Sequence, residues 1–168
     1  STTSQLAMGD ALAIAAMKYK RFGNLEFKKL HPAGSLGAKL KTVEDIMLKG
    51  KKIPFVNKDL NMKKALNILS DKRLGILIVQ NNQKRTIGII TDGQIRRFNQ
   101  KNINLYSTTV NKVMTKKPVS IDKDVLAAKA LSLMNLRKIT SLCVHDKKNK
   151  LKTIGVLHIH NILQNNIS

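Results

Sequence analysis

Three of the four histidines lie near the end of the chain, where their side chains could bind a metal ion. His145, His158 and His160 occur there together with the single cysteine, Cys143, and imidazole and thiolate are the usual ligands of zinc. His158 and His160 are two residues apart, so we expect their side chains to point to opposite faces of a strand or to splay apart on a helix. No carboxylate or second cysteine supplies a third ligand, and Cys143 lies in an apolar run typical of core packing. The sequence predicts no metal site and no cofactor.

Basic and hydroxyl side chains that could hold an anion occur together after another apolar run. Guanidinium groups such as those of Arg96 and Arg97 bind phosphate or carboxylate through paired hydrogen bonds. Thr91 and Asp92 could contact the same anion, but they are equally typical of the N-cap of a helix that starts at Gly93. Ligand binding and a capped helix with solvated arginines therefore remain alternative interpretations.

His31 is the remaining histidine, and it opens the Pro- and Gly-containing segment HPAGSLG at residues 31–37. An imidazole titrates near neutral pH and can move protons in catalysis. Alternatively, His31 caps the end of a short helix predicted at residues 24–30. An alanine-rich helix with Ser and Thr at its start is predicted at residues 1–22. Because nothing before this helix offers a packing partner, we expect that a domain preceded it.

The elements that position these side chains belong to an internal repeat. VEDIM at residues 43–47 is matched by VNKVM at residues 110–114. DLNMKKALNIL at residues 59–69 is matched by DVLAAKALSLM at residues 124–134. In both longer segments the apolar residues follow helical spacing, which predicts one amphipathic helix in each copy.

A β-hairpin and a short closing helix are predicted after each repeated helix. The strands are expected at residues 76–79 and 86–90 and at 141–144 and 153–157, and the closing helices at 93–98 and 160–163. A copy of about 60 residues buries too little surface to be stable alone. We therefore expect the two copies to pack face to face as one domain.

The net charge of +21 raises the question of nucleic-acid binding, since basic surfaces release counterions from phosphates. Lys and Arg are spread over the whole chain, aromatic residues are only 4%, and there is no Trp to stack on bases. These features disfavour a nucleic-acid partner, and a basic nucleic-acid-binding protein remains the least favoured alternative. No run approaches the roughly 18 to 20 apolar residues of a membrane span, and a single cysteine fits a reducing compartment. The sequence predicts a cytoplasmic protein without a membrane partner.

The repeated signatures resemble a tandem pair of CBS domains, which are regulatory modules found beside many enzymes and channels. The resemblance covers residues 41–165 and rests on VEDIM, on the repeated Ile-Gly-Ile or Ile-Gly-Val, and on GIITDG at residues 88–93. It implies an α/β (α+β) fold with small sheets flanked by helices. Residues 41–104 would form the first CBS domain and residues 105–168 the second.

The residues before the pair resemble the junction in D-arabinose-5-phosphate isomerases, where a sugar-isomerase (SIS) domain runs into a CBS pair. MGDALA at residues 8–13, HPAGSLG at 31–37 and TDGQIRR at 91–97 carry this likeness. It implies that residues 1–40 are the end of an SIS domain and its linker, and that His31 stands at the position of an active-site histidine. The parent enzyme would interconvert ribulose 5-phosphate and arabinose 5-phosphate for Kdo and lipopolysaccharide synthesis. The rest of that active site would lie upstream, so we expect this chain to be inactive alone.

In related CBS pairs, ligands lie between the copies, where a Ser or Thr and an Asp three residues later hold phosphate and ribose. Thr91 and Gln94 occupy these positions in the first copy, and His158 and Asn161 in the second. The resemblance implies that a regulatory nucleotide, or a pathway product such as CMP-Kdo, is bound by Thr91, Asp92, Gln94, Arg96, Arg97, His158 and Asn161. It also implies self-association as a homodimer or homotetramer. An assembly module that binds no ligand is the main alternative.

Overall fold

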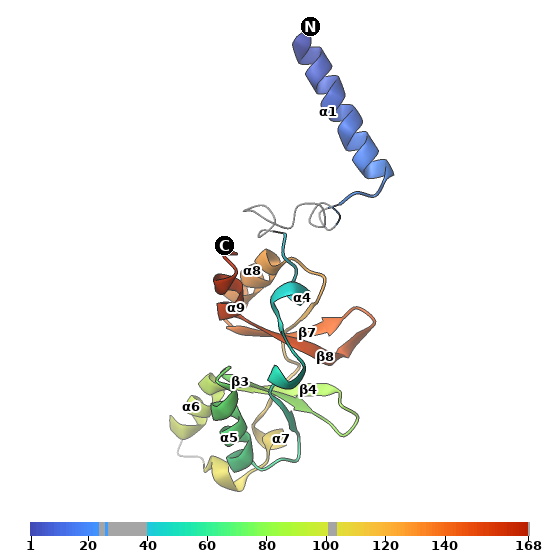
Figure 1. Cartoon of the computed structure of the whole chain (residues 1–168). Coiled ribbons are helices and arrows are strands. Elements are labelled where there is room, and N and C mark those ends of the chain that lie inside the picture. The colour runs from blue at the N-terminus through green and yellow to red at the C-terminus, as the bar shows by residue number, and fades with distance from the viewer. Residues whose placement is uncertain (24–25, 27–39, 101–103, 168) are drawn as a thin grey trace. The chain divides into compact units, whose positions relative to one another are not determined.

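The computed structural model describes residues 1–23, 26, 40–100 and 104–167, and the chain divides into two units, Ser1–Lys41 and Thr42–Ser168 (Figure 1). In the first unit, α1 (Thr2–Tyr19) confirms the predicted amino-terminal helix. None of its residues is buried, and the side chains of Leu6 and Leu12 are 72% and 63% exposed. Apart from residue 26, the predicted helix at 24–30 lies outside the described residues, as does the segment 31–37 with the candidate His31.

The second unit contains both copies of the repeat and two mixed four-stranded sheets, which confirms the expected α+β fold. One sheet has the strand order β2-β3-β4-β5 and the other β1-β8-β7-β6. The strands are β1 (Leu48–Lys49), β2 (Phe55–Asn57), β3 (Ile76–Gln80), β4 (Thr86–Thr91), β5 (Thr115–Lys116), β6 (Ser120–Asp122), β7 (Ser141–Asp146) and β8 (Asn149–His158). The α-helices are α4 (Val43–Ile46), α5 (Met62–Lys72), α6 (Asp92–Gln100), α7 (Val110–Val113), α8 (Ala127–Arg137) and α9 (Ile159–Gln164). Short 3-10 turns lie at Gly50–Lys52 and Leu105–Ser107.

The two long helices, α5 and α8, begin three residues later than the repeat predicts. Asp59 lies instead in a turn that ends β2, where its N–H donates to the Asn57 side chain at 2.9 Å, and Asp124 lies in the matching turn after β6. Asn61 then caps α5 by accepting a backbone hydrogen bond at 2.8 Å. The aspartates at the start of the repeated segments thus lie in turns before each helix, and only in the first copy does a polar side chain then cap the helix.

The opening segment of each copy packs on the other copy. Residues 42–49, which we call the first strap, contain α4 and β1. Val43 of this strap belongs to the core around α8, β7 and β8, and β1 pairs with β8. Residues 109–116, the second strap, contain α7 and β5. Val110 belongs to the core of the first copy, and β5 pairs with β4. The straps therefore cross over, which an alignment of the two copies does not reveal.

A cluster of buried side chains from both copies joins the two sheets. Ile76 and Ile78 of β3 pack there with Cys143 of β7 and Val156 of β8. This packing confirms that the two copies face each other within one unit. Burial raises the pKa of the Cys143 thiol to about 12, so the thiol stays protonated and chemically inert.

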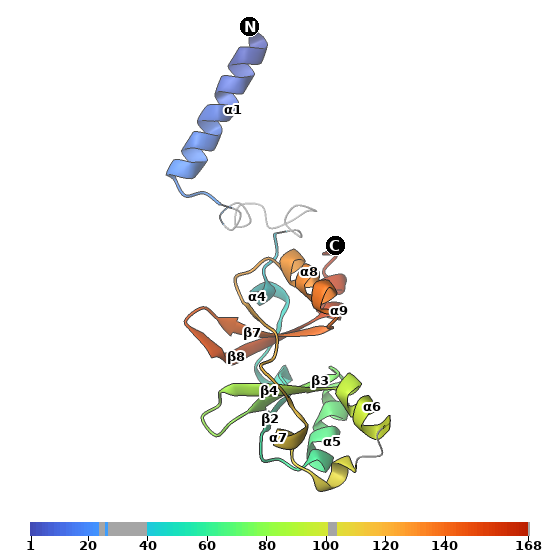
Figure 2. The same ribbon diagram turned by 180° about the vertical axis from the view of Figure 1, so that it is seen from behind.

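The second unit has two distinct ends (Figures 1 and 2). Helices α5, α6, α8 and α9 lie at one end, which we call the helix end, and the turns of both hairpins lie at the other, the hairpin end. At the helix end Ile76 pairs with Thr91 in one sheet and Ser141 pairs with His158 in the other. The predicted site residues of the two copies therefore lie at the same end.

Candidate ligand-binding site

Thr91 and His158 each stand where a strand meets the following helix, and each caps that helix. The Thr91 hydroxyl accepts a hydrogen bond from the Gln94 N–H at 3.4 Å, and the Gln94 side chain accepts one from the Thr91 N–H at 3.0 Å. In the second copy the His158 ring accepts from the His160 N–H at 3.2 Å. Asn161 Oδ1 accepts from the His158 N–H at 3.1 Å. The two copies thus use matching caps, and α6 starts one residue earlier than predicted.

Gln94 points into the first copy. Its amide nitrogen donates to the Thr115 hydroxyl at 2.6 Å and to the Val113 carbonyl at 3.4 Å, both in the second strap. Because its amide is bonded at both nitrogen and oxygen, Gln94 fastens the second strap to α6. Gln94, Asn161 and the exposed Arg96 do not line the cavity that opens at the helix end.

The helix-end cavity has a volume of about 530 Å³ and lies between the two copies. It brings together Thr91, Asp92, Arg97 and His158, four of the residues that the sequence predicts. These four side chains come together because the two hairpins pack against each other. The strand ends near which they lie are at the helix end in both copies. The volume falls in the range of roughly 300 to 1,000 Å³ that is usual for small-molecule sites.

Three basic side chains that line the helix-end cavity were not among the predicted site residues. Arg73 follows α5 and Lys138 follows α8, with left-handed backbones at φ 52° and 53°. A left-handed residue of this kind ends a helix and turns the chain sharply. His160 in the first turn of α9 is the third. The matching positions of Arg73 and Lys138 in the two copies are the signal that could have identified them.

The lining combines positive charge with apolar surface. Arg73, Arg97 and Lys138 supply three cations, and Asp92 supplies the one carboxylate among the lining residues. The apolar part comes from Leu74, Ile76, Ile89, Val119 and Ile139. Such a lining suits an anionic ligand that also carries a flat apolar group.

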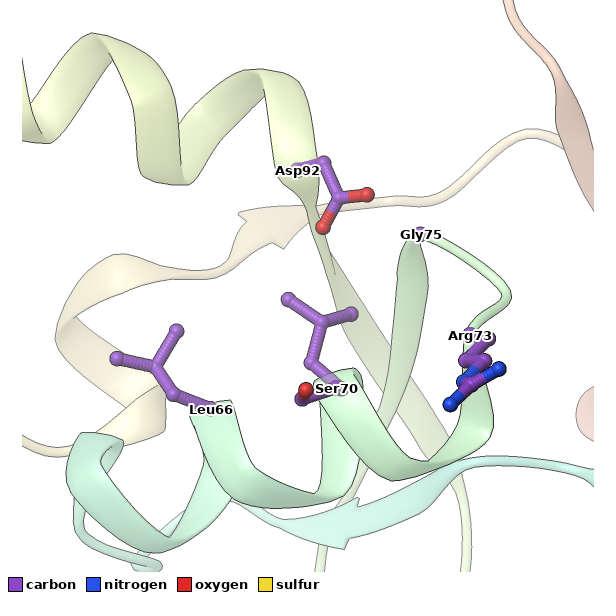
Figure 3. A pocket seen from close by; sticks show the side chains of 6 residues that line it. Leu66, Ser70, Arg73, Gly75 and Asp92 are labelled. Carbon is purple, nitrogen blue, oxygen red and sulfur yellow. The ribbon is translucent and has the colours of Figure 1, made fainter.

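A side groove of about 340 Å³ adjoins the cavity between α5 and α6 (Figure 3). The groove shares Arg73, Gly75 and Asp92 with the cavity, and Leu66 and Ser70 of α5 form one wall. Gly75 has a φ of 63°, and a Cβ there would lie 2.9 Å from a carboxylate oxygen of Asp92. Glycine favours this left-handed backbone, and a Cβ here would displace the Asp92 carboxylate from its present place. The groove extends the space open to a ligand.

His158 and His160 lie together, so the expectation that they splay apart is wrong. Their ring centroids are 4.8 Å apart, because His158 has an extended N-cap backbone (φ −102°, ψ 148°) and its ring turns toward the first turn of α9. Burial, and then the neighbouring His160, lower the pKa of His158. Since Nδ1 of His158 accepts a backbone N–H, the ring that caps α9 is the neutral form with its proton on Nε2.

Replacing His158 by Asn is expected to reduce the acid sensitivity of the fold while keeping the cap, because Asn is a preferred N-cap residue. A histidine whose folded pKa is lowered contributes stability above its ordinary pKa of 6.5 and loses it as the pH falls through the folded value. Melting curves between about pH 8 and pH 5 measure this difference. The melting temperature of the wild type should fall more steeply below neutral pH than that of His158→Asn. Parallel pH profiles would contradict this role.

The described residues contain neither a cluster of metal-ligating side chains nor a membrane-spanning helix. No three His, Cys, Asp or Glu side chains in this part of the chain gather where they could hold a metal ion. None of the described helices is long and apolar enough to cross a membrane.

The model of the CBS domain family matches the chain twice, over residues 43–101 and 110–167. Two curated relatives match nearly all of it. The arabinose 5-phosphate isomerase KdsD of Francisella tularensis is 41% identical over 165 residues, and KdsD of Yersinia pestis is 39% identical over 165 residues. These matches cover 98% of this chain but 50% and 49% of the relatives. The chain therefore spans about half the length of the curated relatives it matches.

A solved structure with the same fold is that of CBSX2 from Arabidopsis thaliana in complex with AMP. It superimposes with a TM-score of 0.64 at 24% sequence identity and covers 73% of this chain and 93% of CBSX2. At 24% sequence identity, this structural likeness shows that the two proteins share a fold and carries no statement about ligands.

Proposed function

Because this chain belongs to the CBS domain family and contains the domain twice, we propose that it is the regulatory part of an arabinose 5-phosphate isomerase and binds a nucleotide in the helix-end cavity. The parent enzyme would interconvert ribulose 5-phosphate and arabinose 5-phosphate for Kdo and lipopolysaccharide synthesis. Residues 1–40 would be the end of its SIS domain, followed by CBS domains at 41–104 and 105–168. This chain alone would then be inactive, because most of the catalytic site would lie in the other half.

The lining of the helix-end cavity is the observation that carries the nucleotide proposal. Arg73, Arg97 and Lys138 can receive a phosphate, and the apolar strands can receive a base. Thr91 and Ser141 also line the cavity, and their hydroxyls can form hydrogen bonds with a ribose. AMP is the ligand in the CBSX2 complex, which supports AMP as the first probe.

Two observations support the isomerase assignment. The identity of 39–41% to the two KdsD relatives extends over residues before the CBS domains as well as through them. In addition, α1 has apolar residues on all sides and none is buried, and such a helix normally packs inside a larger protein. Both agree with an amino-terminal helix that belongs to a catalytic domain.

Regulation requires that the ligand prefers one arrangement of the enzyme over another. A nucleotide in the helix-end cavity would contact both CBS copies at once, so it can favour one relative placement of the copies. The segment 31–37 would pass that preference to the catalytic domain. Self-association of the CBS pair as a homodimer or homotetramer would spread the effect between subunits.

Isothermal titration calorimetry of the chain with AMP, and separately with CMP-Kdo, tests the ligand proposal. AMP is expected to bind, and Arg97→Gln is expected to weaken binding by about tenfold, because a charge-assisted hydrogen bond to phosphate is lost. The nucleotide that binds should also change the isomerisation rate of the full-length enzyme.

Arg96→Gln is the matched control for Arg97→Gln. The two arginines are neighbours on α6 and the charge change is the same, but Arg96 does not line the cavity. Equal losses of affinity in both variants would contradict the placement of the phosphate. Absence of binding by AMP and CMP-Kdo would favour the ligand-independent assembly module, which sedimentation would reveal as a stable oligomer.

A further inference from the structure

A second cavity of about 470 Å³ lies at the hairpin end, on the side of the unit opposite the helix-end cavity. The two cavities share no lining residue. Its walls come from β4 and the second strap on one side and from β7 and β8 on the other. Both copies therefore build this site, which we call the hairpin-end cavity.

Uncompensated positive charge distinguishes the hairpin-end cavity. Lys116 at the end of β5 and the following Lys117 line the cavity on one side, and Lys150 near the start of β8 lines it on the other. No Asp or Glu lines the cavity. Within the described residues, none of these three lysines takes part in an ion pair. Three ammonium groups from two segments of the chain around one space favour a ligand with more than one negative charge.

The floor of the cavity carries buried polar groups that can bond hydroxyls. His145 and Thr153 are only 7% and 6% exposed. The Thr86 hydroxyl donates to the Thr153 hydroxyl at 2.7 Å and so joins the two hairpins. His145 Nδ1 lies 3.3 Å from the Asp146 carbonyl oxygen, which leaves Nε2 as a further polar atom of the ring. These buried hydroxyl and imidazole groups can donate hydrogen bonds to, and accept them from, the hydroxyl groups of a polyol.

We propose that the hairpin-end cavity binds a small sugar phosphate, with the phosphate among Lys116, Lys117 and Lys150 and the sugar hydroxyls toward Thr153 and His145. A phosphate monoester carries close to two charges at neutral pH and offers several acceptors to the lysines. Neither cavity is lined by Phe, Tyr or Trp, but the helix-end cavity offers a base five Leu, Ile and Val side chains, whereas the hairpin-end cavity has two, Ile87 and Leu151. The proposal uses only this cavity and does not rest on the isomerase assignment.

Titration of the ¹⁵N-labelled chain with ribose 5-phosphate tests the proposal by NMR. Saturable shifts are expected for the backbone signals of Thr86, Leu151 and Thr153, and they should persist when the chain is saturated with AMP. Ribose should produce no saturable shift, and inorganic phosphate should bind more weakly than ribose 5-phosphate. Shifts confined to the helix end, or equal affinity for phosphate and ribose 5-phosphate, would overturn the proposal.

The double variant Lys116→Gln, Lys150→Gln is expected to weaken ribose 5-phosphate binding by about tenfold or more. Lys147→Gln with Lys148→Gln is the matched control, because it removes the same charge from the turn of the β7–β8 hairpin, which carries Lys150, outside the cavity lining. All four lysines are exposed, so melting temperatures should stay near the wild-type value. Equal affinities of the two double variants would contradict the lysine contacts.

Discussion

A chain that begins at Gly50 is expected to lose the fold of the second copy, whereas a chain that begins at Thr42 keeps it. The two differ by the first strap, residues 42–49. Val43, Ile46 and Met47 of this strap are at most 8% exposed and lie in the core of the second copy. Burial of such side chains contributes about 1.5–3 kcal/mol each. Their loss would remove several kcal/mol from a domain stability of typically about 5–15 kcal/mol.

Backbone and charge contacts of the first strap add to this loss. The Val43 N–H donates to the Val125 carbonyl at 2.9 Å, and the Glu44 N–H donates to the Lys123 carbonyl at 2.9 Å. The Lys123 ammonium also donates to the Glu44 carboxylate at 3.1 Å, and this hydrogen bond raises the pKa of Lys123. Without the strap, β8 would lose its pairing with β1 and would keep only its pairing with β7. The core of the second copy would also lose the strap side chains that pack on it.

Thermal melting and amide hydrogen exchange of the two truncated chains measure the effect. In residues 50–168 the amides of β7 and β8 should exchange rapidly and the cooperative transition should weaken or vanish. In residues 42–168 the same amides should be protected as in the whole chain. A chain 50–168 that melts cooperatively at the temperature of 42–168 would show that the strap is dispensable.

Gly88→Ala is expected to lower the free energy of unfolding by about 1–3 kcal/mol, the usual cost of forcing extra atoms into a packed site. A Cβ at Gly88 would lie 2.8 Å from the carbonyl oxygen of Thr115 and 2.7 Å from the sulfur of Met114. The sulfur can move, but the carbonyl belongs to β5, which pairs with β4 at this point. The second strap would have to shift away from the first copy.

Gly93→Ala is the control for Gly88→Ala. A Cβ at Gly93 would have no heavy atom closer than 3.7 Å, and Ala is favoured over Gly in a helix by up to about 1 kcal/mol. Denaturant unfolding of the three proteins should rank Gly93→Ala at or above the wild type and Gly88→Ala well below it. Equal stability of Gly88→Ala and the wild type would contradict the tight approach of the second strap.

The repeated helices and hairpins could be predicted because their signals are local. Apolar spacing within about ten residues placed α5, α8 and the strands β3, β4, β7 and β8 to within a few residues. The strands β1, β2, β5 and β6 were missed, because strands of two or three residues are too short to show a pattern. Their partners lie in distant segments, and in β1 and β5 these belong to the other copy.

The candidate site could be predicted only in part. Thr91, Asp92, Arg97 and His158 do line one cavity, whereas Gln94 and Asn161 complete helix caps and Arg96 lies outside the lining. A polar residue three positions after a strand end can serve a cap or a ligand equally well, and the spacing is the same for both. Only the direction of the side chain separates the two roles.

The sequence by itself determined the repeat, the helices and hairpins of each copy, and the capped strand ends that carry polar side chains. These features depend on residues a few positions apart. Only the tertiary structure decided that Met47 packs on Gly155 and Met114 on Gly88, so that the straps cross between copies. It also decided that basic residues line two cavities at opposite ends of the unit, and that both copies contribute to the lining of each cavity. Such contacts join residues far apart in the chain, and their geometry follows from how the two sheets pack.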